Sequence, residues 1–180
     1  VSLRCQDFIT SNASMLTAAS YCGHADTLRA LLKSGKILPD FFPEGQGFTQ
    51  VLRHAIMSHD RDTVQTLLDS DFVSTDMVSS GPMVFENPHT LDCNVLYVAV
   101  FTGISKADQD DAGVLEALLA SPKLTPEALL QRIPQDSQVL DTVKGSTSFL
   151  LAVRHQQVEL VKAFLNSEKM TQQLFGNAGL

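Results

Sequence analysis

Apolar and polar positions follow a pattern that occurs four times along the chain. Each copy has two apolar residues, one variable residue, a serine, and an apolar residue three positions further on. The copies are Leu31-Leu32-Lys33-Ser34 before Ile37, Leu67-Leu68-Asp69-Ser70 before Val73, Leu118-Leu119-Ala120-Ser121 before Leu124, and Phe164-Leu165-Asn166-Ser167 before Met170. Ahead of each copy, an alanine follows a large apolar residue by three positions: Leu16 and Ala19, Leu52 and Ala55, Leu96 and Ala99, Phe149 and Ala152. Self-similarity of this kind is the signature of a repeat protein.

The spacing within a copy predicts two helices. Leu16 and Ala19 lie three apart and share one side of a short helix that ends near Gly23. A second helix follows, in which leucines at positions 28, 31 and 32 form one apolar stripe. Each unit is therefore predicted to be a helical hairpin.

A further apolar pair after each copy predicts a short third helix. These pairs are Phe41-Phe42, Met77-Val78, Ala128-Leu129 and Leu174-Phe175. In the third unit, Thr125 is a suitable N-cap and Pro126 suits the first helical position. We expect each apolar pair to pack under its hairpin.

Together these elements predict an all-α fold, a helical-repeat solenoid that forms a single domain over residues 1–180. The expected units are a capping helix over 1–13 and repeats over 14–42, 50–78, 94–130 and 148–175. Long, unequal connections with glycine and proline separate the repeats. In stacked repeats, the edge that carries such connections and the adjoining inner helices commonly form a concave binding surface.

The first unit resembles an ankyrin repeat. It has small alanines, Gly23-His24 at the turn between the helices, and Leu31-Leu32 before Gly35. Later units depart from that family: His59-Asp60 replaces Gly-His, residues 104–112 are inserted after Gly103, and Gln156 replaces the glycine. None of the four has an intact Thr-Pro-Leu-His opening. The resemblance covers most of the chain and implies an ankyrin-like solenoid of about four irregular units, in which His24 is structural.

Charge favours a protein partner over a nucleic acid. The net charge is -7. From Asp69 to Glu116 the chain contains nine acidic residues and only one basic residue, Lys106. Nucleic-acid binders need clustered Lys and Arg. The acidic run fits either a partner with a basic surface or a solvated face without a partner.

Cysteine usage and hydropathy bear on the compartment. Cys5, Cys22 and Cys93 have no close pairing and leave an odd cysteine over, which suits a reducing, cytoplasmic environment. No apolar run approaches the ~20 residues of a membrane span, and no signal peptide opens the chain. The start at Val1 suggests a segment of a longer protein.

Candidate chemistry is weak. Cys and His do not occur at metal-ligand spacing. Cys22 lies near His24, but the repeat turn already explains that proximity, and Gly45-Gln46-Gly47 is not followed by the helix that phosphate loops use. We expect no catalytic residues, no metal and no cofactor.

Positions two and three residues after each repeated alanine are the expected partner-binding residues. They are Tyr21 and Cys22, Met57 and Ser58, Phe101 and Thr102, and Arg154 and His155. A position two residues beyond a buried alanine is rotated by about 200° and points away from the core. The corresponding pair in ankyrin repeats lines the partner-facing groove. Alternatively, Met57 and Phe101 cover gaps between units.

The sequence thus predicts a non-catalytic, monomeric module that binds a folded protein partner, with no nucleic acid and no membrane. The style of the degenerate repeats also resembles C-terminal domains of bacterial effectors of the arginine ADP-riboxanase type. That resemblance implies delivery into the host cytosol and recruitment of a host caspase to a linked ADP-ribosyl-transferring domain. A self-associating scaffold and an enzyme with a loop-built site are the alternatives.

Overall fold

The described part of the chain is all-helical, which confirms the predicted fold class. The computed structural model describes residues 15–37, 47–79, 94–105, 112–133 and 144–170. Across these ranges, ten helices are accompanied by one isolated β-bridge, between Arg132 and Thr147. The capping helix expected over residues 1–13 lies outside the described residues.

Eight of the helices form four successive antiparallel pairs. Pair 1 is α2 (Met15–Tyr21) and α3 (Ala25–Lys33), and pair 2 is α4 (Phe48–Ser58) and α5 (Arg61–Leu68). Pair 3 is α7 (Val95–Ser105) and α8 (Gly113–Ala120), and pair 4 is α9 (Ser148–Arg154) and α10 (Val158–Asn166). Two short helices, α6 (Thr75–Ser79) and the 3₁₀-helix η2 (Pro126–Leu130), follow pairs 2 and 3.

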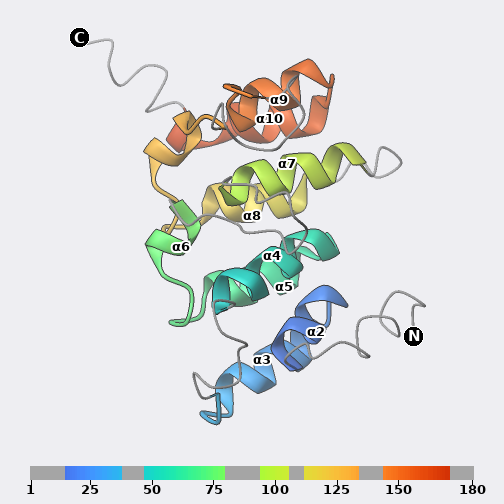
Figure 1. The fold of residues 1–180 in the computed structure, drawn as a ribbon, viewed down its shortest axis with the longest axis vertical. Coiled ribbons are helices and arrows are strands. Elements are labelled where there is room, and N and C mark those ends of the chain that lie inside the picture. Colours follow the sequence, from blue (N-terminus) through green and yellow to red (C-terminus); the bar gives the residue numbers. More distant parts are fainter. Residues whose placement is uncertain (1–14, 38–46, 80–93, 106–111, 134–143, 171–180) are drawn as a thin grey trace.

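The pairs are stacked in chain order, with pair 1 at the bottom and pair 4 at the top (Figure 1). The first helices of the pairs, which we call the inner helices, contact one another in the order α2, α4, α7, α9. The second helices, which we call the outer helices, do the same in the order α3, α5, α8, α10. Each pair therefore buries its apolar residues against its neighbours.

The repeated alanines and leucines account for this close stacking. Ala19, Ala55, Ala99 and Ala152 are all buried, and small side chains at these positions let neighbouring inner helices approach closely. In the outer helices, Leu67, Leu118 and Phe164 are completely buried. Small residues on the inner helices and large apolar residues on the outer helices thus fill the contacts between successive pairs.

In pairs 1, 2 and 4, the turn between the two helices keeps the same conformation despite different residues. Gly23 has a φ of 69°, and His59 and Gln156, at the corresponding positions, have φ values of 61° and 56°. Left-handed backbone is costly for residues with a side chain, so packing of the helices must impose it at His59 and Gln156. The departures from glycine seen in the sequence therefore do not alter this turn.

The expected short third helices are present where the chain is described. In α6, Val78 is completely buried and Met77 packs against the core. Ala128 and Leu129 of η2 are also buried, although η2 is a 3₁₀-helix and the Thr125 side chain makes no capping hydrogen bond. The chain is helical again at residues 168–170. The pairs Phe41-Phe42 and Leu174-Phe175 lie outside the described residues.

The repeated serine terminates the outer helices. The Oγ atoms of Ser34 and Ser70 each donate to the carbonyl three residues earlier, at 2.7 Å. The hydroxyl oxygens of Ser34 and Ser121 accept from the backbone N–H two residues later, at 3.2 Å. Because serine competes for backbone hydrogen bonds, it stops the helix and turns the chain.

Candidate functional site

The inner helices carry the eight partner-binding residues predicted from the sequence, and their exposure differs. Phe101 is 42% exposed and Arg154 is also exposed, as the 200° rotation predicts. Tyr21 and Met57 are only partly buried, and Met57 packs against the hydrophobic core. The packing of Met57 against the core leaves only part of its side chain exposed.

Phe101 is held in place by a buried aromatic ring one turn earlier in α7. The rings of Tyr97 and Phe101 are stacked, with centroids 5.8 Å apart and an interplanar angle of 18°. Tyr97 is 2% exposed, since α7 is enclosed by its neighbours through Val100. A buried ring beneath an exposed one limits the motion of the exposed ring, which lowers the entropy that binding would cost.

Tyr21 contacts the next pair rather than standing free. Its ring meets that of His54 edge to face, with centroids 5.8 Å apart and an interplanar angle of 70°. His54 is 7% exposed, and its Nδ1 donates to the carbonyl of Gln50 at 2.8 Å. One face of Tyr21 is thus committed to the junction between α2 and α4.

Two of the four second members, Ser58 and Thr102, bond to the backbone of their own helices. Ser58 Oγ donates to the carbonyl of Ala55 at 2.7 Å, and Thr102 Oγ1 donates to that of Val98 at 2.7 Å. Such local bonds use the hydroxyl hydrogen within the helix. Ser58 and Thr102 can offer a partner only the acceptor capacity of their oxygens.

Cys22 is disulfide-bonded, which corrects the expectation that the cysteines are unpaired. Its partner is outside the described residues. Sequence separation alone could not reveal the pairing, because folding sets which cysteines approach. The disulfide at Cys22 therefore removes the basis on which cysteine usage suggested a reducing compartment.

At the top of the row of inner helices, Arg154 and His155 are both exposed. His155 is the C-cap of α9, and its backbone N–H donates to the carbonyl of Leu151 at 3.1 Å. His24 at the lower end is exposed at the N-cap of α3, and its side chain makes no capping hydrogen bond.

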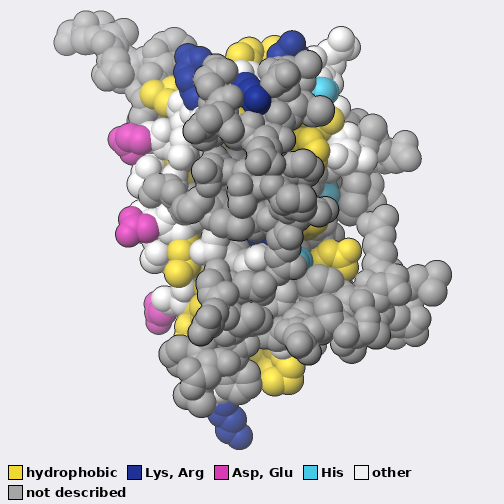
Figure 2. All heavy atoms as spheres, in the orientation of Figure 1, with side chains coloured by type: hydrophobic (Ala, Val, Ile, Leu, Met, Phe, Trp, Pro, Cys, Tyr) yellow, Lys and Arg dark blue, Asp and Glu magenta, His cyan; other side chains and the backbone are white. Residues whose placement is uncertain are grey.

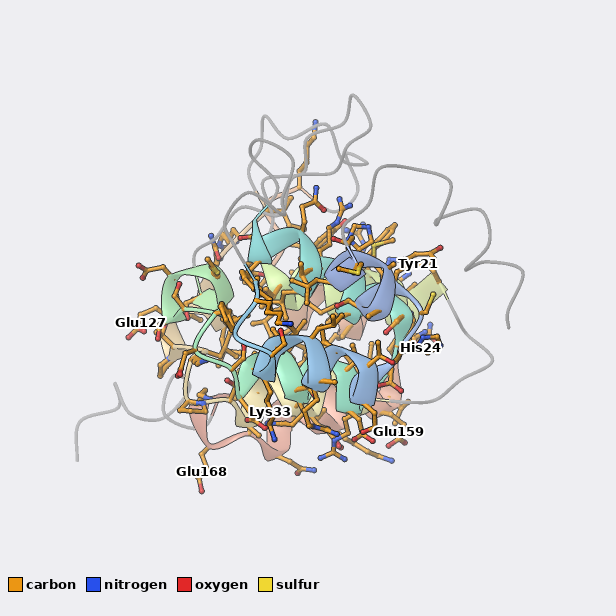
Figure 3. The ribbon with its side chains drawn as sticks, turned by 90° about the horizontal axis from the view of Figure 1, so that it is seen from below. Tyr21, His24, Lys33, Glu127, Glu159 and Glu168 are labelled. Carbon is orange, nitrogen blue, oxygen red and sulfur yellow. The ribbon has the colours of Figure 1, made fainter. Side chains whose placement is uncertain are left out.

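Several acidic side chains lie on a different edge of the molecule. Figure 2 shows them along the edge that α6 and η2 form. Seen from below, Glu127 of η2 lies on the side opposite Tyr21 and His24 (Figure 3). The acidic edge formed by α6 and η2 and the surface at Tyr21 are therefore separate. Glu86, Asp92 and residues 108–111 of the acidic run lie outside the described residues.

Sequence reasoning missed two lysines that join successive pairs. Lys123 Nζ donates to the carbonyl of Ser70 at 2.5 Å, and Lys169 Nζ donates to those of Leu119 and Ser121 at 2.5 and 2.6 Å. Each lysine thereby meets carbonyls at the C-terminal end of the preceding outer helix, where a cation is favoured. Burial lowers the pKa of Lys169, and the carboxylate of Glu168 opposes that effect.

Two open grooves lie between outer helices. One, of about 450 Å³, is lined by α3 and α5 and includes Arg29, Asp62 and Phe72. The other, of about 720 Å³, lies between α8 and α10 and includes Glu116 and Lys169. Lys169 is already engaged with carbonyls there, and Asn166 and Glu168 of the lining are exposed.

The described residues offer no metal centre and no membrane span. No three His, Cys, Asp or Glu side chains within the described ranges are grouped so that they could hold a metal ion. None of the helices in that part of the chain has the length and hydropathy that crossing a bilayer requires.

Comparison with protein-family models, with curated proteins and with solved structures finds no match for the chain.

Proposed function

We propose that the chain is a non-catalytic protein-recognition module, an ankyrin-like helical-repeat solenoid that binds a folded partner with its inner-helix face. The observation that carries the proposal is Phe101, an exposed ring held over buried Tyr97 on a row of four adjacent inner helices. Aromatic rings are enriched in the buried centres of protein–protein interfaces.

The chemistry of this face fits an interface anchor. Aromatic side chains and arginine contribute most of the affinity in many interfaces, provided that they are desolvated on binding. Phe101 would enter an apolar pocket of the partner, with exposed Arg154 and His155 towards one end of the contact. The acidic edge at α6 and η2 is a separate surface, so a basic partner surface is not required for this contact.

Site-specific photo-crosslinking tests the proposal. Phe101 is replaced by a photoreactive benzoyl-phenylalanine, and the matched control carries the same group at Leu130, which is 53% exposed on η2. We expect one discrete heterologous adduct from position 101 and no such adduct from position 130. Equal labelling from both positions would show that the inner-helix face has no special role.

The narrower hypothesis is recruitment of a host caspase to a linked effector enzyme, delivered into the host cytosol. It follows from the effector resemblance, and no described residue distinguishes a caspase from another folded protein. A pull-down from host cytosol tests it: enrichment of a caspase that is lost in Phe101→Ala would support it, and a pull-down without caspase enrichment would contradict it.

A further inference from the structure

The two ends of the stack expose side chains whose counterparts are buried wherever two helix pairs meet inside it. We call the side of a pair that is turned towards the next pair its upper face, and the side turned towards the preceding pair its lower face. On the upper side, Ile56 and Val100 are completely buried beneath the next inner helix, and Leu68 and Leu119 are 3% and 4% exposed. In pair 4, the residues at these same positions are Val153 and Leu165, which are 45% and 52% exposed. Leu150 is 50% exposed, whereas Tyr97, at the same position in pair 3, is 2% exposed. Figure 2 shows hydrophobic side chains at this upper end, over α9 and α10.

The lower side of pair 1 shows the complementary half of the junction. Met15 is 62% exposed, whereas Val51 and Val95, at the same position in pairs 2 and 3, are completely buried. Ala30 is exposed, while its counterparts Thr66, Ala117 and Ala163 are buried by the preceding pair. The two ends of the molecule therefore carry the two halves of one recurring contact.

A lysine gives an independent indication of what fits the upper end. Lys123 and Lys169, each two residues after the repeated serine, donate to carbonyls of the preceding outer helix. Lys36 stands two residues after Ser34 and is exposed at the lower end. At the upper end, the carbonyls of Leu165 and Ser167 occupy the positions of the lysine acceptors Leu119 and Ser121.

We propose that the upper face of pair 4 binds the lower face of pair 1 of a second copy of this chain. The interior junctions establish which face covers which, because every upper face is covered by a lower face. A second copy supplies that lower face together with Lys36. The contact joins two different surfaces, so it is heterologous and can extend beyond a dimer.

The association is weak and depends on concentration. It buries only a few partly exposed side chains at each end, and this gain is set against the loss of translational and rotational freedom. We expect association between about 10 µM and about 1 mM protein. This inference departs from the monomer expected from the sequence and does not depend on the proposed role of Phe101.

Two blocked variants test the proposal in the full chain. The upper face is blocked by Val153→Lys with Leu165→Lys, and the lower face by Met15→Glu with Ala30→Glu. All four positions are exposed, so circular dichroism melting should show that both variants remain folded. Sedimentation equilibrium of the wild type should show an average mass that rises with concentration beyond that of a dimer.

The mixture of the two variants gives the decisive result. Each variant alone should remain a monomer, and an equimolar mixture should form a dimer and nothing larger, because one functional face of each kind remains. Adding Lys36→Met to the upper-blocked variant should weaken this mixed dimer about tenfold.

Three outcomes would overturn the proposal. One is a wild type that stays monomeric up to about 1 mM. Another is a lower-blocked variant that dimerises by itself, because this would show upper faces meeting each other. The third is a mixture of folded variants that fails to dimerise.

Discussion

The first and last junctions of the stack join equivalent helices by different chemistry. At the last junction, Lys169 donates to two carbonyls at the end of α8. At the first, Phe72 occupies the lysine position and stacks on Phe48 of its own pair, with ring centroids 4.8 Å apart. A hydrogen bond of 3.1 Å from Arg29 to Thr66 joins the outer helices there. One repeat position can therefore hold neighbouring pairs together with an ammonium group, or stabilise its own pair with an aromatic ring.

Removing the lysine should have the largest effect on stability. Lys169→Met removes a charged donor from two carbonyls and is expected to lower the free energy of unfolding by about 2–3 kcal/mol. The matched control is Lys36→Met, where the same change at an exposed position should cost less than about 0.5 kcal/mol. Urea denaturation of both variants measures the difference. Equal losses would show that the bridge to α8 contributes nothing.

Glycines at equivalent repeat positions should also respond differently, because Gly23 lies in a turn and Gly103 lies within a helix. Gly23 has a φ of 69°, and an added Cβ would lie 3.1 Å from Asp60 Cβ, so Gly23→Ala should cost about 1–3 kcal/mol. Gly103 lies within α7, and its added Cβ would meet only the end of the flexible Leu160 side chain. Helix propensity favours alanine there, and we expect Gly103→Ala to change stability by less than about 1 kcal/mol.

Thermal melting of these two variants provides the measurement. A smaller loss for Gly23→Ala than for Gly103→Ala would contradict the assignment of a strained turn to pair 1.

Replacing the aromatic ring at position 72 by lysine, the residue found at the last junction, should have a moderate effect on stability. Phe72→Lys removes the ring that stacks on Phe48, and the expected loss is about 1 kcal/mol. The loss should vanish when Phe48→Leu is already present, because the stacked partner is then absent. A stabilising effect of Phe72→Lys would mean that the lysine bridge suits the first junction equally well.

The smallest expected effect is a pH dependence at Lys169. Its pKa is lowered in the folded state relative to the ordinary value of 10.5, so the unfolded chain binds more protons below that pH. Stability therefore rises as the pH increases towards 10.5. The difference in the free energy of unfolding between the wild type and Lys169→Met should therefore increase slightly over this range. A falling difference would contradict the cited shift.

Much of the fold followed from short-range periodicity. The buried alanine three residues after a large apolar residue and the leucine stripe each identified a helix, because both residues of a contact lie within one turn or two. The 3₁₀ form of η2 did not follow, since Thr125 and Pro126 fit the start of either helix type. The lysine bridges left a readable signal: Ser34, Ser121 and Ser167 each precede a lysine by two residues.

The candidate site was predictable only where helix rotation decides exposure. Rotation about the helix axis placed Phe101 and Arg154 outside the core, but it did not show that Met57 would pack partly against the core. Nor did it show that Ser58 and Thr102 would bond to their own helices. The disulfide at Cys22 depends on contacts between distant segments, which spacing does not encode.

The central claim is that the inner-helix face binds a folded partner through Phe101. Once photo-crosslinking has identified a partner, calorimetric titration should compare Phe101→Ala with Leu130→Ala, two truncations of exposed apolar side chains on α7 and η2. We predict at least a tenfold or so loss of affinity for Phe101→Ala and less than about a twofold change for Leu130→Ala. Equal affinities for the two folded variants would contradict the claim.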